Sequence, residues 1–550
     1  MAGSGMSKGQ AKTAISGQEP DSDQEEVTAV VCLDSDLQDG QMKEVEVGRH
    51  KVLLVRSKGE YSAIGGLCTH YGAPLWKGAL SGNRVRCPWH GACFNIKTGD
   101  LEEYPGLDSL PSFKVKIEDS KVYVSATKKA LEMTKRVKKM GCRMPGESHI
   151  VVLIGGGPAT LLCAETLRQE RYGGRIIMVT RENMLPYDKT KLSKVLSVQD
   201  QNILLRQTDF FQQYDIEVWL GKEATSVNTN KNVITFNDGS SQRYDQLLIA
   251  TGCRARILHC PGADLDNVRL LQTPDDATKI HQEALGKNTV ILGTSFIGME
   301  VASCLSDRAS SVTVIGSSEV PFQKTLGSEI GRLTMKMLED KLVKFYMNES
   351  VTEVKGEGGK VKEVVLRSGK VLPADIFIVA IGVIPNSDFL KESSVKLTSK
   401  KTVIVDKFMR TNVPGVFCAG DIASFPLSLW KNEQVNIGHW QVAQAHGRIA
   451  ALNMLNIPTE INSVPFFWTV LLGKSFRYAG YGEGYTEIVM KGKLEEMKFL
   501  AFYIKNDEVV AVASLNFDPA VSQVAEMMAA GRTITKTQAA SDDLSWLKVA

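Results

Sequence analysis

The 550-residue sequence predicts a multidomain fold, with an all-β domain at the N-terminus, a longer α/β region and a C-terminal α+β domain. Residues 27–126 consist of short apolar and polar alternations separated by Gly, Asn and Asp, which is the pattern of a small β domain. Two segments, 149–182 and 290–315, each join a buried strand through a glycine turn to a helix. From about residue 463 alternating strands return, with one helix near 520–530.

Composition places the chain among ordinary globular proteins, with 43% hydrophobic and 23% charged residues. No window approaches the roughly 18 to 20 uninterrupted apolar residues of a transmembrane helix. Residues 1–26 are rich in Gly, Ser, Lys, Gln and Glu, lack a signal-peptide pattern and are expected to be disordered. We therefore expect an intracellular protein, with the cytoplasm favoured and mitochondrial import left open. A net charge of +3 is too small to predict specific nucleic-acid binding.

Ten cysteines are spread at irregular spacing, and no Cys-x-x-Cys or Cys-x4-Cys redox pair occurs. This argues against a disulfide reductase and for a reducing compartment.

The most specific pattern in the N-terminal domain is Cys-x-His followed, after a short interval, by Cys-x2-His. The candidate ligands are Cys68, His70, Cys87 and His90. Two thiolates and two imidazoles are the set that a Rieske [2Fe-2S] centre needs, with both cysteines on one iron and both histidines on the other. The same set could also hold one tetrahedral zinc ion. The loops, with glycines beside the ligands, resemble the Rieske ferredoxin family over residues 27–126, and this resemblance favours the iron-sulfur cluster.

Residues 127–148 are expected to form a basic linker with a helical part. Its basic residues are Lys128, Lys129, Lys135, Arg136, Lys138 and Lys139. A solvated helix face and a docking patch for an acidic partner or a membrane surface both remain open.

The first βαβ segment is predicted to bind a dinucleotide. Its strand is followed by three glycines and a helix, so backbone N–H groups and the positive end of the helix dipole can face a pyrophosphate. The candidate binding residues are Gly155, Gly157, Pro158 and Glu182, the last placed to accept hydrogen bonds from a ribose. Thr160 replaces the third glycine of the fingerprint, where a Cβ crowds the contact between helix and strand.

The second βαβ segment predicts a second dinucleotide site. Gly293 and Gly298 are present, while Ser295 replaces the middle glycine. No acidic residue directly follows the second strand, although Glu319 could substitute for it. No arginine follows that strand to bind a 2′-phosphate, so NADH is favoured over NADPH.

Two further segments lie between and after these units. Thr251 and Gly252 end a buried strand, and Gly420-Asp421 ends another. Together the segments resemble the two-dinucleotide flavoprotein reductases over residues 149–456. The resemblance implies that Asp421 holds the ribityl chain of FAD. It also implies an FAD-binding domain at 149–272 and 387–456, an inserted NAD(P)H-binding domain at 273–386 and a C-terminal reductase domain at 457–550.

Finer features resemble the apoptosis-inducing-factor and ferredoxin-reductase branch, including forms that carry a Rieske domain. The features are Leu-Pro-Tyr-Asp at 185–188, Lys194, Glu300, His439-Trp440 and Trp468. The resemblance implies that Lys194 and Glu300 form a catalytic pair beside the flavin N5, and that the three ring residues lie along the flavin. Taken singly, the same residues could be a surface lysine, a helix carboxylate and core aromatics.

The function expected from these resemblances is electron transfer from NADH through FAD to the chain's own Rieske cluster, and on to an unidentified acceptor. The alternative is a redox-responsive, pro-apoptotic signalling or scaffold flavoprotein in which NADH switches conformation or dimerisation. Intact cluster ligands favour the enzyme, whereas Thr160 and Ser295 lend weight to the scaffold. A Rieske oxygenase is disfavoured because no two-histidine, one-carboxylate set for mononuclear iron is found. Formation of a homodimer is left open.

Overall fold

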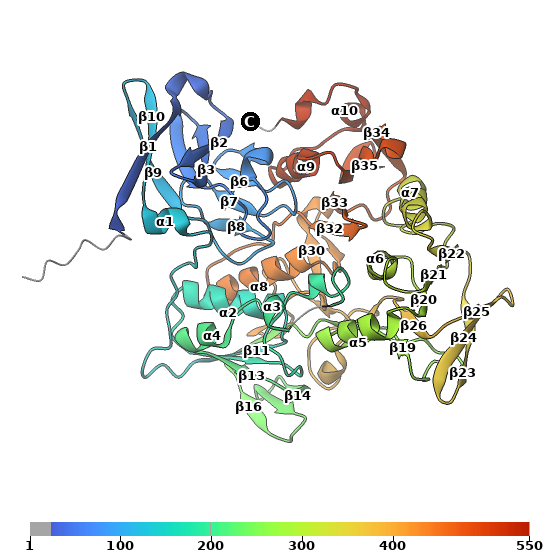
Figure 1. Cartoon of the computed structure of the whole chain (residues 1–550). Coiled ribbons are helices and arrows are strands. Elements are labelled where there is room, and N and C mark those ends of the chain that lie inside the picture. Colours follow the sequence, from blue (N-terminus) through green and yellow to red (C-terminus); the bar gives the residue numbers. More distant parts are fainter. Residues whose placement is uncertain (1–23, 198–199, 549–550) are drawn as a thin grey trace, which may run out of the picture.

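The computed structural model describes residues 24–197 and 200–548. The tail expected to be disordered, residues 1–26, lies almost wholly outside this range. Figure 1 shows the N-terminal β domain against the C-terminal domain, with two α/β domains below and beside them. The predicted fold class is confirmed.

The N-terminal domain contains two antiparallel sheets, in the strand orders β1-β10-β9-β4-β3-β2 and β5-β6-β7-β8. Its strands are β1 (Glu26–Leu33), β2 (Gln41–Val47), β3 (His50–Ser57), β4 (Glu60–Gly65), β5 (Ala79–Ser81), β6 (Arg84–Arg86), β7 (Cys93–Asn95), β8 (Leu101–Glu103), β9 (Ser112–Glu118) and β10 (Lys121–Thr127). The apolar run of β3 is buried on both faces, because Leu53 and Val55 pack in one hydrophobic cluster and Val52 and Leu54 in another. The candidate cluster ligands lie on the loops that follow β4 and β6.

The linker is helical only over α1 (Lys128–Glu132), so the expected basic helix is wrong beyond Glu132. The reason is a pair of backbone hydrogen bonds between Arg136 and Ser109, which hold this part of the linker extended. The Arg136 side chain also pairs with Asp100 at 2.5 Å. At Arg136 the linker is therefore attached to the β domain.

The first parallel-sheet domain has the strand order β13-β12-β11-β17-β29. Its main elements are β11 (Ile150–Ile154), α2 (Pro158–Gln169), β12 (Arg175–Val179), α3 (Asp200–Ile203), α4 (Thr208–Gln213), β13 (Ile216–Trp219), β17 (Gln246–Ile249), β29 (Val416–Cys418) and α8 (Trp440–Met454). Smaller pairings are formed by β14 (Ala224–Asn228), β15 (Val233–Phe236), β16 (Ser241–Arg243), β18 (Cys253–Ala255), β27 (Val383–Pro385), β28 (Val403–Ile404), β30 (Ala423–Leu427) and β31 (Glu433–Val435). The predicted strand, turn, helix and strand of the first βαβ segment are confirmed.

The second parallel-sheet domain repeats this plan, with the order β19-β26-β20-β21-β22. Its elements are β19 (Val268–Arg269), α5 (Pro274–Ala284), β20 (Asn288–Leu292), α6 (Phe296–Leu305), β21 (Ser311–Ile315), α7 (Ser328–Glu339), β22 (Lys344–Tyr346), β23 (Val351–Glu357), β24 (Lys360–Leu366), β25 (Val371–Pro373) and β26 (Ile376–Val379). Because β19 pairs with β26, this sheet begins before residue 273, the boundary expected from the sequence.

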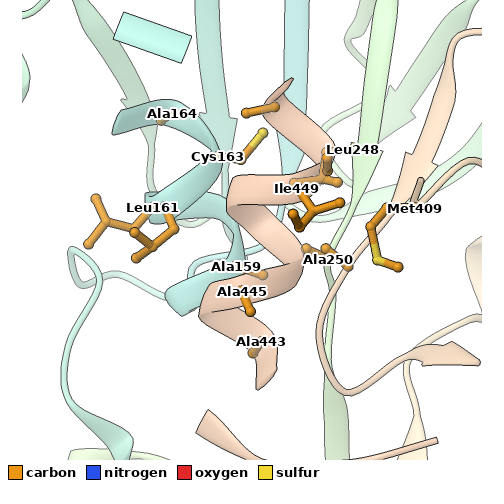
Figure 2. Close-up of a cluster of buried hydrophobic side chains, with 14 of the residues drawn as sticks. Ala159, Leu161, Cys163, Ala164, Leu248, Ala250, Met409, Ala443, Ala445 and Ile449 are labelled. Carbon is orange, nitrogen blue, oxygen red and sulfur yellow. The ribbon is translucent and has the colours of Figure 1, made fainter. Parts of the chain in front are cut away.

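Helices α2 and α8 pack closely in the first parallel-sheet domain, although 282 positions separate their starts in the sequence. Figure 2 shows the small residues Ala159, Ala443 and Ala445 along this contact, with Ile449 further up α8. A Cβ added at Gly447 would lie 2.1 Å from the Ala159 carbonyl oxygen. Glycine at this position therefore permits the close approach of the two helices.

The C-terminal domain has an antiparallel sheet in the order β32-β33-β36-β35-β34, with α9 against it. Its elements are β32 (Phe466–Leu471), β33 (Lys474–Gly480), β34 (Glu487–Lys493), β35 (Lys498–Lys505), β36 (Glu508–Leu515), α9 (Ala520–Ala529) and α10 (Lys536–Ala540). Helix α9 also contacts β5 and β6 of the N-terminal domain. Among the helices of the described residues, none is long and apolar enough to cross a membrane.

Candidate functional site

The two cluster loops have the same backbone plan. In each, the cysteine N–H donates to the alanine carbonyl five residues later, from Cys68 to Ala73 at 2.8 Å and from Cys87 to Ala92 at 2.7 Å. The residue before each alanine is a glycine with positive φ. The loops are therefore closed in the same way, and each presents a cysteine and a histidine.

The four candidate ligands are brought together in pairs. The Nδ1 atoms of His70 and His90 are 3.2 Å apart. A hydrogen bond between the thiols and burial raise the pKa of Cys68. Burial alone would also raise the pKa of Cys87, but the hydrogen bonds that it accepts, from the Cys68 thiol and from backbone N–H groups, outweigh burial and lower it.

The histidine rings are buried and neutral at pH 7, because burial lowers the pKa of His70 to about 4 and that of His90 well below its usual value. Neutral imidazoles can act as metal ligands. Within the described residues, no three or more His, Cys, Asp or Glu side chains are placed to hold one metal ion. The His70–His90 pair and the Cys68–Cys87 pair match the ligand division of a Rieske centre, in which both imidazoles bind one iron and both thiolates bind the other.

A buried ion pair joins the second cluster loop to the C-terminal domain. The Arg86 guanidinium is fully buried, donates to Glu526 of α9 at 2.7 Å and donates to the Gly91 carbonyl at 3.0 Å. Burial works against the charge of Arg86, but the Cys93 and Glu526 side chains raise its pKa above its ordinary value. Glu526 is held ionised in turn, since the two nearby arginines outweigh the effect of its burial and lower its pKa. Removing one partner from such a pair typically costs about 3–5 kcal/mol.

Three more contacts hold the same loop against the C-terminal domain. Ser522 donates to the Cys87 carbonyl at 2.8 Å, and Arg477 donates to the Trp89 carbonyl at 2.8 Å. The Phe466 ring lies so close to Gly91 that a Cβ there would be 2.6 Å away. The backbone of this loop is thus bound directly to the C-terminal domain.

Trp468 lies between the cluster loops and the first parallel-sheet domain. Its ring centroid is 4.2 Å from that of His90 and 5.5 Å from that of His70. The Lys194 Nζ lies 6.0 Å from the same ring. One buried aromatic side chain therefore lies near both the cluster histidines and Lys194.

Lys194 and Glu300, predicted to act as a pair, form an ion pair at 3.2 Å. Glu300 comes from α6 of the second parallel-sheet domain and is 4% exposed. Its other partners are Ser193 and Thr469, the latter donating at 2.7 Å. The pair therefore joins both α/β domains and β32, and its carboxylate is fully supported by hydrogen bonds.

The glycine turn of the first parallel-sheet domain leaves room for a ligand. Gly155 has φ +139°, and a Cβ there would lie 2.0 Å from the Ala250 carbonyl oxygen. At Gly157, the N-cap of α2, a Cβ would meet no atom within 4 Å. Pro158 opens the helix, where a missing N–H costs nothing. Glu182 lies beyond β12 and accepts a hydrogen bond from Tyr187 at 2.7 Å.

The other residues expected at the flavin lie on loops of the same domain. Thr251 and Gly252 bond to Asn386, which ties the end of β17 to the segment after β27. Asp421 follows β29, and burial raises its pKa.

At the start of α8, Trp440 is half-buried and opens the helix. The preceding His439 has a buried Nδ1 without a hydrogen-bond partner, and burial lowers its pKa to about 4. The open space at Gly157 and this unpartnered nitrogen are what a bound flavin nucleotide would use.

The second parallel-sheet domain has a similar turn at Gly293, where a Cβ would lie 2.0 Å from the Ala380 carbonyl oxygen. Ser295 is the N-cap of α6, and a Cβ at Gly298 would lie 2.1 Å from the Gly293 carbonyl oxygen. Backbone bonding places Ser318 where the first domain has Glu182. Glu319, one position on, is exposed and lies 3.7 Å from Arg332.

The residues that hold the N-terminal domain against the rest of the chain were not predicted from the sequence. These are Arg86, Arg477, Ser522 and Glu526, together with Tyr71, which donates to Asp188 at 3.0 Å. The sequence contained a detectable signal for the Arg86–Glu526 ion pair. Glu526 stands alone as a charge in the apolar helix α9, and Arg86 lies on a short strand beside a candidate ligand. A buried charge in either place requires a partner.

Family models match three parts of the chain. They are the Rieske [2Fe-2S] domain at residues 27–114, the pyridine nucleotide-disulphide oxidoreductase at 149–447 and the reductase C-terminal domain at 466–549. Over 538 residues the chain is 50% identical to apoptosis-inducing factor 3 of Homo sapiens, covering 96% of this chain and 89% of that protein.

Other relatives are reductases of electron carriers. The chain is 30% identical to the ferredoxin–NAD(+) reductase subunit of the benzene 1,2-dioxygenase system of Pseudomonas putida, covering 66% of this chain and 89% of that protein. A crystal structure of a ferredoxin reductase from Rhodopseudomonas palustris aligns with a TM-score of 0.70 at 27% identity, covering 73% of this chain and all of that one.

Proposed function

Because this chain belongs to the pyridine nucleotide-disulphide oxidoreductase family and also carries a Rieske [2Fe-2S] domain, we propose that it passes electrons from NAD(P)H through FAD to its own cluster. It is a flavoprotein oxidoreductase of the ferredoxin-reductase type. The physiological acceptor beyond the cluster is a one-electron carrier, as the names of the ferredoxin and rubredoxin reductases among its relatives suggest.

The observation that carries this proposal is the position of Trp468, which lies near the cluster histidine His90 and near Lys194. Its ring lies 4.2 Å from that of His90, and the Lys194 Nζ lies 6.0 Å from its centroid. The relatives named as rubredoxin–NAD(+) and ferredoxin–NAD(+) reductases match 66% of this chain. Here the ferredoxin-like domain is part of the chain and is held against the reductase body by buried contacts.

We assign the cluster ligands as Cys68, His70, Cys87 and His90. The FAD pyrophosphate is assigned to the Gly155 and Gly157 turn with Pro158, its ribose to Glu182, and the rest of the nucleotide to Thr251, Gly252, Asp421, His439, Trp440 and Trp468. The nicotinamide nucleotide is assigned to Gly293 and Gly298. The cluster thiols and neutral imidazoles, the open space at Gly157 and the unpartnered His439 Nδ1 support these assignments.

When bound, FAD accepts a hydride and can release its electrons one at a time to an iron-sulfur cluster that takes one. The protein supplies position and electrostatics. Lys194 is paired with the Glu300 carboxylate, and Ser193 and Thr469 hold that carboxylate in place by hydrogen bonds. The Trp468 ring is buried where it packs against His90.

NADH remains favoured over NADPH in this proposal. An acid at Glu319 disfavours a 2′-phosphate by charge repulsion, although Arg332 at 3.7 Å neutralises part of that charge. The scaffold alternative stays a prediction. The buried contacts between the Rieske domain and the reductase body favour turnover, because they hold the cluster loops in place against Trp468.

The test is an anaerobic titration of the holoprotein with NADH, followed by visible absorption and by electron paramagnetic resonance of the reduced cluster. We expect flavin and cluster to be reduced together. Trp468→Leu should slow reduction of the cluster more than that of the flavin, whereas Trp219→Leu on the edge strand β13 should not. Flavin reduction with a cluster that stays oxidised would refute the internal transfer.

A further inference from the structure

The two histidines of the cluster loops stack on different aromatic rings. His90 lies against Trp468, which is 8% exposed, with ring centroids 4.2 Å apart. His70 stacks on Tyr71 at 3.8 Å, with an angle of 17° between the planes, and Tyr71 is 39% exposed. His90 therefore packs most closely on the buried Trp468 and His70 on the exposed Tyr71, and each histidine also meets the other aromatic ring edge-on.

The side that faces the reductase body is closed. Arg86 and Glu526 are 0% and 2% exposed, and Ser522 holds the carbonyl of Cys87. Separating these surfaces would leave buried charges unpaired, which is strongly unfavourable. An acceptor protein must therefore approach the cluster from the solvent side while the domains stay docked.

The solvent side of the first cluster loop is apolar. Three large side chains of this loop are exposed, with Leu67 at 41%, Tyr71 at 39% and Trp76 at 42%. Exposed aromatic residues of this kind are enriched at protein interfaces. The Tyr71 hydroxyl donates to Asp188 at 3.0 Å, so its ring is held in place from the reductase body.

Positive charge surrounds this apolar loop. The Lys77 Nζ lies 5.3 Å from the Trp76 ring centroid, and the Lys191 Nζ lies 5.7 Å from that of Tyr71. Lys135 of the linker is close enough to act electrostatically on His70. The carboxylate of Asp188 is buried at 7% exposure and bonded to Tyr71 and Thr190. Lys77, Lys135 and Lys191 therefore bring positive charge to this side of the cluster loops.

We propose that Tyr71 is the contact through which an electron leaves the cluster, and that the acceptor is an acidic one-electron carrier protein docked on Leu67, Tyr71 and Trp76. This inference rests on the proposed function. One electron passes from the reduced cluster to the oxidised carrier, and no bond is formed or broken. Tyr71 acts as a stacked contact and as the positioning residue of His70, because its ring lies 3.8 Å from the His70 ring and its hydroxyl is bonded to Asp188.

The test uses holoprotein whose cluster has been reduced with dithionite, so that it does not depend on NADH. The reduced protein is mixed with an acidic b-type cytochrome haem domain or with a basic c-type cytochrome. We expect the acidic carrier to be reduced faster at low ionic strength, with a rate that falls steeply as salt is added. Carbodiimide cross-linking should join its carboxylates to Lys77, Lys135 or Lys191.

Variants separate the two parts of the inference. Lys77→Glu with Lys135→Glu should slow reduction of the acidic carrier about tenfold at low salt, whereas Lys341→Glu near the end of α7 should not. Tyr71→Leu should lose most of the rate of electron transfer from the cluster to the carrier, and should leave the cluster more reduced during turnover. Tyr71→Phe should restore this transfer because it keeps the ring. Absorption and paramagnetic resonance spectra confirm that each variant retains its cluster.

Faster transfer to the basic carrier, a rate independent of salt, or a normal rate in Tyr71→Leu would overturn this inference. A cluster that dithionite reduces and NADH does not would overturn the proposed function instead, and the dithionite experiment would still decide the exit route.

Discussion

In both parallel-sheet domains, the first glycine of the turn lies beneath the carbonyl that ends a neighbouring strand. A Cβ at Gly155 would lie 2.0 Å from the Ala250 oxygen, and one at Gly293 would lie 2.0 Å from the Ala380 oxygen. Both glycines have positive φ, at +139° and +128°. The same backbone restriction therefore builds both turns, and neither position can accept another residue.

The domains differ in what lies close to the helix that follows the turn. In the second, a Cβ at Gly298 would lie 2.1 Å from the Gly293 oxygen, so the helix contacts its own turn. In the first, Thr160 occupies that position and donates to the Gly157 carbonyl at 2.9 Å. The close contact is instead between α2 and α8 (Figure 2). Gly447 permits it, because a Cβ there would collide with the Ala159 carbonyl oxygen. The third glycine therefore sets how closely the helix can approach its neighbours and does not form the turn.

The middle position of the fingerprint also differs between the two domains. A Cβ at Gly157 would meet nothing within 4 Å, which explains why the fold accepts Ser295 at the corresponding position of the second domain. This position affects only how closely a pyrophosphate can approach the backbone.

The largest effect is expected from changing the first glycines one at a time. Gly155→Ala should yield protein without flavin, because a Cβ would collide with a backbone oxygen. Gly293→Ala should retain flavin and lose its reduction by NADH. Flavin content of the purified protein and an anaerobic NADH titration measure the two effects. Loss of flavin in Gly293→Ala with normal NADH binding would contradict the assignment of the two domains.

The third-glycine position should respond unequally in the two domains. Gly298→Ala should destabilise the protein by about 1–3 kcal/mol, because the helix must move away from the Gly293 oxygen. Thr160→Ala should cost about 1 kcal/mol, the value of its hydrogen bond to Gly157. Urea unfolding of each variant beside the parent measures the difference. Equal costs would mean that the two helices lie at the same distance from their turns.

Acid should affect the first parallel-sheet domain more than the second. Burial lowers the pKa of His446 on α8 to about 3 in the folded protein, below the value of about 6.5 in an unfolded chain. The unfolded state therefore binds the proton first. Stability is complete above about pH 6.5 and is lost by about 1.4 kcal/mol per pH unit as the pH falls toward 3. His259 and His281 of the second domain are at least partly exposed.

His446→Gln keeps an acceptor for the Gly420 N–H, which His446 Nδ1 accepts at 3.1 Å. Between pH 7 and pH 5 we expect this variant to lose about 2 kcal/mol less than the parent. Urea-induced release of flavin at the two pH values reports on the first domain. The same acid sensitivity in parent and variant would show that His446 is not its source.

The smallest effect is expected at the ribose position, where the first domain has Glu182 and the second has Ser318 followed by Glu319. Glu319→Gln removes a negative charge and frees Arg332, so the ratio of kcat/KM for NADPH to that for NADH should rise about threefold to fivefold. Glu329→Gln, also exposed and on α7, is the matched control. An unchanged ratio would place the nucleotide ribose away from Glu319.

Local patterns in the sequence predicted much of the fold. The apolar run Ile150–Ile154, the glycines after it and the helix beyond are contiguous, so the order of residue types indicates the βαβ unit directly. The cluster loops could be found for the same reason, because both ligands of each loop lie within four positions of each other. The basic helix was wrong beyond Glu132, since an extended backbone contact with Ser109 overrides local propensity.

Ligand type and spacing are local properties, so the sequence alone indicates which residues are candidates to bind a cluster or a nucleotide. How the candidate sites are joined depends on contacts between domains. Arg86 meets Glu526 across 440 positions, and His90 meets Trp468 from a different domain. Such pairings depend on how surfaces of separate domains fit and exclude water, and a single sequence does not encode them in any short-range pattern. For the same reason, the sequence does not indicate that Tyr71 is exposed while Trp468 is buried.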